Sequence, residues 1–211
     1  MRVVTGAAKG RRLKGPKTPG TRPILDRVKT ALFDILSWRI EDARFLDLFA
    51  GTGGVGIEAL SRGAASATFI EMSIPIVKLI RENLVITGLS EHAEVLHMDS
   101  FKFLQNHAAL TTQNAGAPIR AYDMIYVAPP QYQEMAARAL GMLDSSPLLA
   151  ENGQVIVQIH PKERPGVVAV PLKRLAQSDE RRYGSTLLLF YKIRQSELEE
   201  EMSDANTITN T

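Results

Sequence analysis

A glycine-rich turn between an apolar run and a helical pattern constrains this chain more than any other feature. Residues 47–56 read Asp-Leu-Phe-Ala-Gly-Thr-Gly-Gly-Val-Gly, after the buried-strand pattern of residues 44–49 and before a helical pattern that begins at Val55. Glycine has no Cβ, so the backbone can turn sharply there and a ligand can approach it closely. The sequence therefore predicts a strand-to-helix corner of an α/β sheet that holds a nucleotide-like cofactor.

Two cofactors fit such a corner. The spacing of Gly51, Gly53 and Gly56 matches the dinucleotide fingerprint, and Glu71 follows Gly51 by twenty residues, where a ribose-binding carboxylate is expected. S-adenosylmethionine fits better, because Asp47 attracts its ammonium and sulfonium but would repel a pyrophosphate. A turn that binds nothing stays open as a third reading, since glycines alone are a weak signal.

The composition narrows the class of protein. The 211 residues suffice for one domain with a well-buried core and appendages. No stretch has the length and apolarity of a membrane span or a signal peptide, so we expect a cytoplasmic protein. Cysteine is absent, which excludes thiolate metal sites and methylation of pyrimidine carbon 5 through a cysteine adduct. The four histidines show no ligand spacing, and we expect no metal site.

Charge is distributed unevenly along the chain. The net charge is +2, yet residues 1–25 contain seven basic and no acidic side chains, and residues 195–211 contain five acidic and no basic ones. A basic arm on a neutral body predicts a polyanionic partner, although a solvated terminus is the simpler alternative. The side chains that we expect to contact such a polyanion are Lys9, Arg11, Arg12, Lys14, Arg22 and Arg27.

Three regions are predicted from these patterns. Residues 1–40 form a basic extension, in which the turn formers of the first twenty residues suit a hairpin or an extended arm and apolar residues from 25 to 36 fall at helical spacing. Residues 41–194 form the cofactor-binding domain. Residues 195–211 read as an acidic, disordered tail.

Strand and helix patterns alternate from residue 44 onward. Strands are predicted at residues 44–49, 66–71, 93–98, 122–127 and 154–159, helices from residue 55 and over 74–84 and 132–143, and a loop over 107–121. Residues 167–175 and 182–192 are predicted to form an antiparallel hairpin at the sheet edge. The alternation predicts an α/β fold with a mostly parallel, seven-stranded sheet and helices on both faces.

Ligands of such sheets bind at the carboxyl ends of the strands. There Glu71 can accept hydrogen bonds from both ribose hydroxyls, Asp99 can accept one from the adenine amine, and Phe101 can pack on the adenine ring. Each of these residues taken alone could instead be a cap or a turn residue. The predicted cofactor site comprises Asp47, Phe49, Ala50, Gly51, Thr52, Gly53, Glu71, Met72, Asp99, Ser100 and Phe101.

Several sequence blocks together resemble the RsmD family, whose members are bacterial S-adenosylmethionine-dependent methyltransferases. The blocks are Lys-Gly-Arg-Arg-Leu at 9–13, Thr-Arg-Pro at 21–23, Asp-Arg-Val at 26–28, Leu-Asp-Leu-Phe-Ala-Gly-Thr-Gly at 46–53, Glu-Ala-Leu-Ser-Arg-Gly-Ala at 58–64 and Tyr-Gly-Ser-Thr at 183–186. The resemblance covers residues 1–192. It implies a Rossmann-like class I methyltransferase fold, S-adenosylmethionine as cofactor, and methyl transfer to the exocyclic N2 of a guanine in 16S rRNA, of the guanine-966 type. The implied partner is ribosomal RNA, in the small ribosomal subunit or an assembly intermediate of it. The resemblance thus makes the basic extension of residues 1–40 an RNA-binding extension.

One block departs from the family. Its members usually carry Asp or Asn, then Pro-Pro and an aromatic residue, where this chain has Ala128, Pro129, Pro130, Gln131 and Tyr132. An exocyclic guanine amine is a poor nucleophile, and the side chain of Ala128 cannot accept its N–H. The resemblance still assigns the acceptor site to these five residues, with carbonyls of the rigid proline loop and the Gln131 amide as acceptors. The ring of Tyr132 would stack on a flipped base.

Three alternative functions remain open at this point. The chain could methylate another nucleic acid, for example at adenine N6. It could be an RNA-binding assembly factor that lost its chemistry together with the acidic residue that Ala128 replaces. An NAD-dependent reductase is disfavoured by Asp47 and by the basic arm.

Overall fold

The computed structural model describes residues 1–16, 24–113, 121–132 and 134–195, and no side chain between 108 and 113. Within these residues the strands form one seven-stranded sheet in the order β3-β2-β1-β4-β5-β7-β6. The strands are β1 Arg44–Asp47, β2 Ser66–Glu71, β3 Ala93–His97, β4 Tyr122–Val127, β5 Leu149–Ile159, β6 Leu175–Tyr183 and β7 Thr186–Ile193. The five neighbouring strands β3, β2, β1, β4 and β5 run parallel to one another, whereas β7 is antiparallel to both β5 and β6. The predicted α/β fold with a C-terminal antiparallel hairpin is confirmed.

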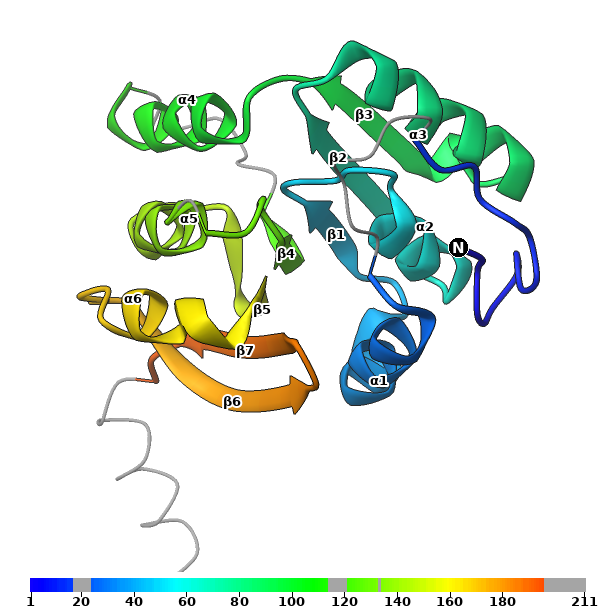
Figure 1. The fold of residues 1–211 in the computed structure, drawn as a ribbon. Helices are drawn as coiled ribbons and strands as arrows, with labels where there is room; N and C mark the ends of the chain where they lie inside the picture. Colours follow the sequence, from blue (N-terminus) through cyan, green and yellow to red (C-terminus); the bar gives the residue numbers. More distant parts are fainter. Residues whose placement is uncertain (17–23, 114–120, 133, 196–211) are drawn as a thin grey trace, which may run out of the picture.

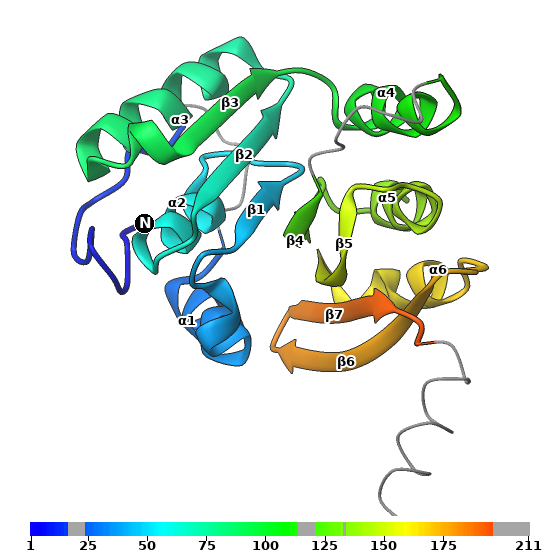
Figure 2. The same cartoon turned by 180° about the vertical axis from the view of Figure 1, so that it is seen from behind.

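Helices cover both faces of the sheet. They are α1 Asp26–Leu36, η1 Ser37–Ile40, α2 Gly54–Ser61, α3 Ile74–Thr87, η2 Ser90–His92, α4 Ser100–Gln113, α5 Met135–Asp144, η3 Pro161–Glu163 and α6 Arg164–Val168, where η marks a 3-10 helix. In Figures 1 and 2, α1, α2 and α3 lie on one side of the sheet, and α4, α5 and α6 lie on the other. Each side has its own buried apolar cluster. No helix among the described residues is long and apolar enough to span a membrane.

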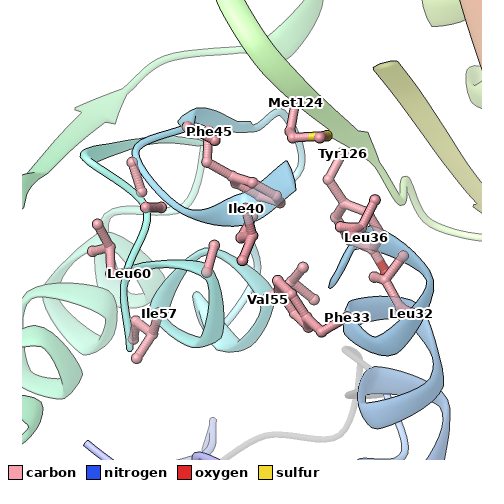
Figure 3. Packing of buried hydrophobic residues seen from close by; sticks show 14 of the residues in the cluster. Leu32, Phe33, Leu36, Ile40, Phe45, Val55, Ile57, Leu60, Met124 and Tyr126 are labelled. Carbon is pink, nitrogen blue, oxygen red and sulfur yellow. The ribbon is translucent and has the colours of Figure 1, made fainter. Parts of the chain in front are cut away.

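The cluster beneath α1 and α2 fixes the position of the glycine-rich turn. Figure 3 shows Phe33 of α1, Phe45 of β1 and Val55 of α2 in this cluster, and the rings of Phe33 and Phe45 stack with centroids 6.5 Å apart. A Cβ on Gly56 would lie 2.3 Å from the ring of Phe69 on β2. Glycine at this position therefore lets α2 pack closely on the sheet, directly after the turn.

The N-terminal residues form a hairpin that is docked on the body. An antiparallel bridge pairs Arg2 with Arg12. The buried carboxylate of Glu58 on α2 accepts hydrogen bonds from the backbone N–H groups of residues 4–5, at 2.8 and 2.9 Å, and lies 3.1 Å from the buried ammonium of Lys29. Because a buried charge needs such partners, this network ties the hairpin to α1 and α2. The hairpin alternative of the sequence prediction is thus found.

Two element predictions were wrong in the C-terminal half. Residues 167–175 are not a strand, since Val167 lies in α6 and the first strand of the hairpin is β6, Leu175–Tyr183. Its outward side chains are polar because β6 is an edge strand, and a search for apolar runs overlooks such a strand. The strand expected from residue 154 begins at Leu149 instead, where β5 pairs with the start of β4.

Two further boundaries differ from the sequence prediction. The expected loop over 107–121 is helical as far as Gln113, where α4 ends. Helix α5 begins at Met135 rather than at Tyr132, because Tyr132 and Glu134 have φ angles of 63° and 54°. A left-handed backbone cannot continue a right-handed α-helix. The acidic tail from residue 196 lies outside the described residues, and the division into three regions stays a prediction.

Candidate functional site

A cavity of about 530 Å³ lies at the carboxyl ends of the central strands. It spans the junction of β1 and β4, where the order of the parallel strands reverses and ligands of α/β sheets usually bind. Most of the predicted site residues line it. They are Asp47, Phe49, Ala50, Gly51, Thr52, Glu71, Met72, Asp99 and Ser100 of the predicted cofactor site, and Ala128, Pro129, Pro130 and Gln131 of the acceptor site.

Three predicted site residues lie outside this lining. Gly53 begins α2 as a left-handed N-cap, with a φ of 76°. The ring of Phe101 packs edge-on against Phe49, and the guanidinium carbon of Arg138 covers it at 4.0 Å. The side chain of Tyr132 is 61% exposed, and its ring centroid lies 5.4 Å from that of His160. The roles predicted for Phe101 and Tyr132 therefore depend on a bound ligand reaching them.

The lining also contains residues that the sequence reasoning missed. They are Met1, Ile24, Gly54, Val55, Tyr126, Met135 and Gln158. Tyr126 and Gln158 carried a usable signal, because each is a residue with a polar group in an apolar run near the carboxyl end of its strand. Met1 and Ile24 carried none, since only the tertiary fold brings the N-terminal segment to the cavity.

Asp47 is the most unusual group in the cavity. Its side chain is buried, and its Oδ2 accepts a hydrogen bond from the N–H of Gly56 at 3.2 Å. Its Oδ1 has no hydrogen-bond partner within the described part of the chain. Burial raises the pKa of Asp47 to about 7, the hydrogen bond from Gly56 opposes this rise, and the charge of Glu71 adds to it. A buried carboxylate oxygen without a partner fits a cationic ligand group, which would lower that pKa again.

Glu71 holds the glycine-rich turn and still has lone pairs to offer. Its Oε2 accepts a hydrogen bond from the N–H of Gly51 at 3.1 Å, and its Oε1 accepts one from the N–H of Ser73 at 2.8 Å. Gly51 has a φ of 51°, a conformation that glycine adopts without strain. Each carboxylate oxygen can accept a second hydrogen bond, so Glu71 can also bind two hydroxyls of a ligand.

Asp99 combines a structural role with a free oxygen. Its Oδ1 accepts a hydrogen bond from the N–H of Lys102 at 2.9 Å, at the start of α4. The sequence reasoning weighed this capping role against ligand binding, and the structure shows the cap. Because Asp99 also lines the cavity, its second oxygen can accept from a ligand amine.

The part of the cavity beside β4 and β5 has no charged side chain among the described lining residues. The hydroxyl of Tyr126 donates to Oε1 of Gln158 at 2.6 Å, a distance typical of O–H···O hydrogen bonds and short for N–H···O. Burial raises the pKa of Tyr126 well above its ordinary value, and the charge of Asp47 adds to this, so the hydroxyl keeps its proton. The amide nitrogen of Gln158 is thereby turned into the donor that is available to a ligand.

The described basic side chains of the arm are not among the residues that line the cavity. Lys9, Arg11, Arg12 and Arg27 are exposed, and Arg22 lies outside the described residues. Lys14 is exposed too, but its ammonium forms an ion pair with Glu82 at 2.9 Å. The described residues contain no cluster of metal-ligating side chains.

Comparison with known proteins identifies the family. The family model described as “Conserved hypothetical protein 95” matches residues 1–192. “Ribosomal RNA small subunit methyltransferase D” of Escherichia coli K12 is 34% identical over 158 residues, which cover 75% of this chain and 74% of that protein. The chain belongs to the RsmD family.

Two further proteins resemble the chain over nearly its full length. “Putative rRNA methyltransferase YlbH” of Bacillus subtilis is 33% identical over 196 residues, which cover 92% of this chain and all of that protein. The solved structure of “Putative methyltransferase yhhF from Escherichia coli” is 29% identical and has a TM-score of 0.76, covering 93% of this chain and 99% of that one. The Rossmann-like methyltransferase fold is thus shown.

Proposed function

We propose that the chain transfers the methyl group of S-adenosylmethionine to the exocyclic N2 of a guanine in 16S rRNA, at the position numbered 966. Methyl transfer to rRNA follows from membership in the RsmD family. One observation carries the proposal for this site. A single cavity connects the proline loop of residues 128–131 to Oδ1 of Asp47, a buried carboxylate oxygen that has no partner among the described residues.

The carboxylates of the cavity suit S-adenosylmethionine, which when bound supplies an electrophilic methyl group on a sulfonium. Asp47 binds the ammonium and faces the cationic end of the cofactor, because its buried charge otherwise lacks compensation. Glu71 binds the ribose hydroxyls with its second lone pairs. Asp99 accepts from the adenine amine. Charge thus selects a cation rather than a pyrophosphate at this turn.

The uncharged part of the cavity suits a flipped base. Backbone carbonyls at Ala128 and Pro129 accept from the guanine amine, and the amide of Gln158 donates to the base edge. The loop carbonyls would hold the amine nitrogen in line with the methyl group that bound S-adenosylmethionine would supply. The sulfur would keep the electron pair of the broken carbon–sulfur bond, and solvent would take the proton of the amine. Catalysis is mainly by positioning, since the described lining contains no strong base beside the acceptor loop.

The RNA itself is bound beyond the cavity. The exposed basic side chains Lys9, Arg11, Arg12 and Arg27, together with Lys14 and Arg22, contact the phosphate backbone of the small-subunit rRNA or of an assembly intermediate. No metal takes part in this scheme. Such a substrate implies a cytoplasmic location for the protein, which we also propose.

Ala128 favours a second candidate function, an RNA-binding assembly factor without chemistry. A carboxylate or amide at this position would accept the amine N–H directly, and the alanine methyl group cannot. The assembly factor would keep the fold, the cofactor cavity and the basic arm. It differs from the enzyme only in turnover.

Incubation with tritiated S-adenosylmethionine and small subunits from a strain that lacks the protein tests this proposal. We expect stoichiometric label that nucleoside mapping recovers as N2-methylguanosine at one position. Label in N6-methyladenosine would contradict the assigned base. RNA binding without any transfer would favour the assembly factor instead.

A further inference from the structure

One carboxylate outside the cavity lining connects the two segments that form its uncharged part. Oε1 of Glu163 accepts a hydrogen bond from the N–H of Tyr132 at 2.9 Å, at the end of the proline loop. Oε2 of the same residue accepts one from the N–H of His160 at 3.0 Å, directly after β5 ends. Both oxygens are therefore used, one for each segment. The carboxylate joins the loop after β4 to the segment that carries Gln158.

The proline loop contains few backbone hydrogen-bond donors. Pro129 and Pro130 have no N–H, so they cannot donate the hydrogen bonds that usually fix a loop. Tyr132 has a φ of 63°, a left-handed conformation that is strained for a residue with a Cβ. Such a conformation persists only when the surroundings fix it, and the hydrogen bond to Glu163 does so at this residue.

The same clamp holds the backbones of two residues whose aromatic rings are in contact. The ring of Tyr132 lies against that of His160, with centroids 5.4 Å apart and an interplanar angle of 44°. Nδ1 of His160 accepts a hydrogen bond from the N–H of Lys162 at 3.2 Å, which fixes the orientation of the imidazole. Tyr132 is largely exposed and directly follows the lining residue Gln131. It can therefore stack on a base only if the loop holds it there.

We propose that Glu163 is a positioning residue for methyl transfer, which acts by clamping the acceptor loop and Tyr132 onto the end of β5. This proposal rests on the proposed function. It adds Glu163 and His160, neither of which lines the cavity, to the set of residues that the reaction needs. Glu163 does not line the cavity, so it acts on the reaction by fixing the positions of the loop and of the Tyr132 ring.

Single-turnover methyl transfer and amide hydrogen exchange test the proposal together. For Glu163→Ala we expect faster exchange at Tyr132 and His160, about tenfold slower transfer to small subunits, and an S-adenosylmethionine affinity within twofold of wild type. Glu163→Gln keeps one acceptor oxygen and should fall between Glu163→Ala and wild type. Glu91→Gln, in the exposed 3-10 helix η2, is the matched control and should leave all three measurements unchanged.

A double variant separates positioning from a general loss of structure. If Glu163 acts through the ring of Tyr132, then Glu163→Ala should slow transfer much less in a Tyr132→Ala background than in wild type. Unchanged transfer by Glu163→Ala in an active enzyme would overturn the proposal and leave the proposed function intact. Equal slowing in both backgrounds would also overturn it. A wild-type protein without any transfer would overturn both.

Discussion

The two parts of the cavity differ in the charge of the side chains that line them. The part at β1, β2 and the loop after β3 is lined by three carboxylates, Asp47, Glu71 and Asp99, and one oxygen of Asp47 is buried without a partner among the described residues. The part at β4 and β5 has no charged side chain in its described lining. There the polar side chains are neutral, and Tyr126 donates a hydrogen bond to Gln158.

This difference separates two kinds of recognition in one cavity. An uncompensated buried carboxylate destabilises the empty protein and is relieved by a cation, so that part selects its ligand by charge. A neutral, preorganised part imposes little electrostatic preference and selects by shape, stacking and hydrogen bonds. The contrast agrees with a cationic methyl donor on one side and a neutral base on the other.

The largest expected effect is on the charged side. Asp47→Asn keeps the size of the side chain and removes its charge, so the affinity for S-adenosylmethionine should fall by about 2 to 4 kcal/mol, roughly 30- to 1000-fold. Isothermal titration calorimetry measures this. Asp123→Asn is the matched control, because Asp123 pairs with Arg44 outside the cavity lining. Equal affinity of wild type and Asp47→Asn would remove Asp47 from the cofactor site.

On the neutral side, the next largest effect should come from Tyr132→Ala. Loss of base stacking worth about 1 to 3 kcal/mol should slow methyl transfer roughly 5- to 150-fold. Single-turnover transfer on small subunits measures the rate, and the cofactor affinity should stay at the wild-type value. A transfer rate indifferent to this substitution would show that Tyr132 does not hold the base.

Asp47→Asn should raise the stability of the unliganded protein, although it lowers the affinity for S-adenosylmethionine. The pKa of Asp47 is raised in the folded state to about 7, so its contribution to stability is present below the unfolded pKa of about 4 and is lost as pH rises through 7. Asp47→Asn removes this loss but leaves a buried amide, and we expect a net gain of about 1 to 2 kcal/mol at pH 8. Chemical denaturation without cofactor measures it.

Asp123 provides the comparison for that stability experiment. Hydrogen bonds from Arg44 lower the pKa of Asp123, so its contribution is present above the unfolded pKa and is lost as pH falls. Asp123→Asn should therefore destabilise the protein at pH 8, opposite in sign to Asp47→Asn. Destabilisation of similar size by both variants would contradict the view that the buried charge of Asp47 lacks a compensating partner in the unliganded protein.

The smallest expected effect comes from substitutions in the basic arm. Replacing Arg11 and Arg12 with Ala should weaken RNA binding and reduce its salt dependence by roughly one unit of slope per lost phosphate contact. Cofactor affinity should not change, because neither side chain lines the cavity. Filter binding over a series of salt concentrations measures the slope, and an unaltered slope would leave the arm as a solvated terminus.

The charged part of the cavity was predictable from the sequence, and much of the neutral part was not. Asp47 precedes the glycine-rich turn, and Glu71 ends the next strand, twenty residues after Gly51. Their spacing along the chain therefore predicts that they lie together. Tyr126 and Gln158 sit on separate strands, within apolar runs, and their mutual hydrogen bond follows only from the pairing of β4 with β5.

The misplaced elements have a related physical cause. The start of α5 could not be read from apolar periodicity, because the left-handed backbone of Tyr132 interrupts it without any glycine to mark the break. Strand β6 was missed because an edge strand needs no apolar run. Local patterns thus specify elements that are buried on both faces, and they fail where long-range contacts decide the conformation.

The pH dependence of cofactor binding tests the central claim most directly, because it reports whether the buried carboxylate of Asp47 must ionise to hold the cofactor. With a pKa of about 7 in the unliganded protein, wild type should bind S-adenosylmethionine about five- to tenfold more tightly at pH 7.5 than at pH 6. Asp47→Asn should bind weakly and equally at both values. Equal affinity of wild type at the two pH values, or the same pH dependence in Asp47→Asn, would contradict the account.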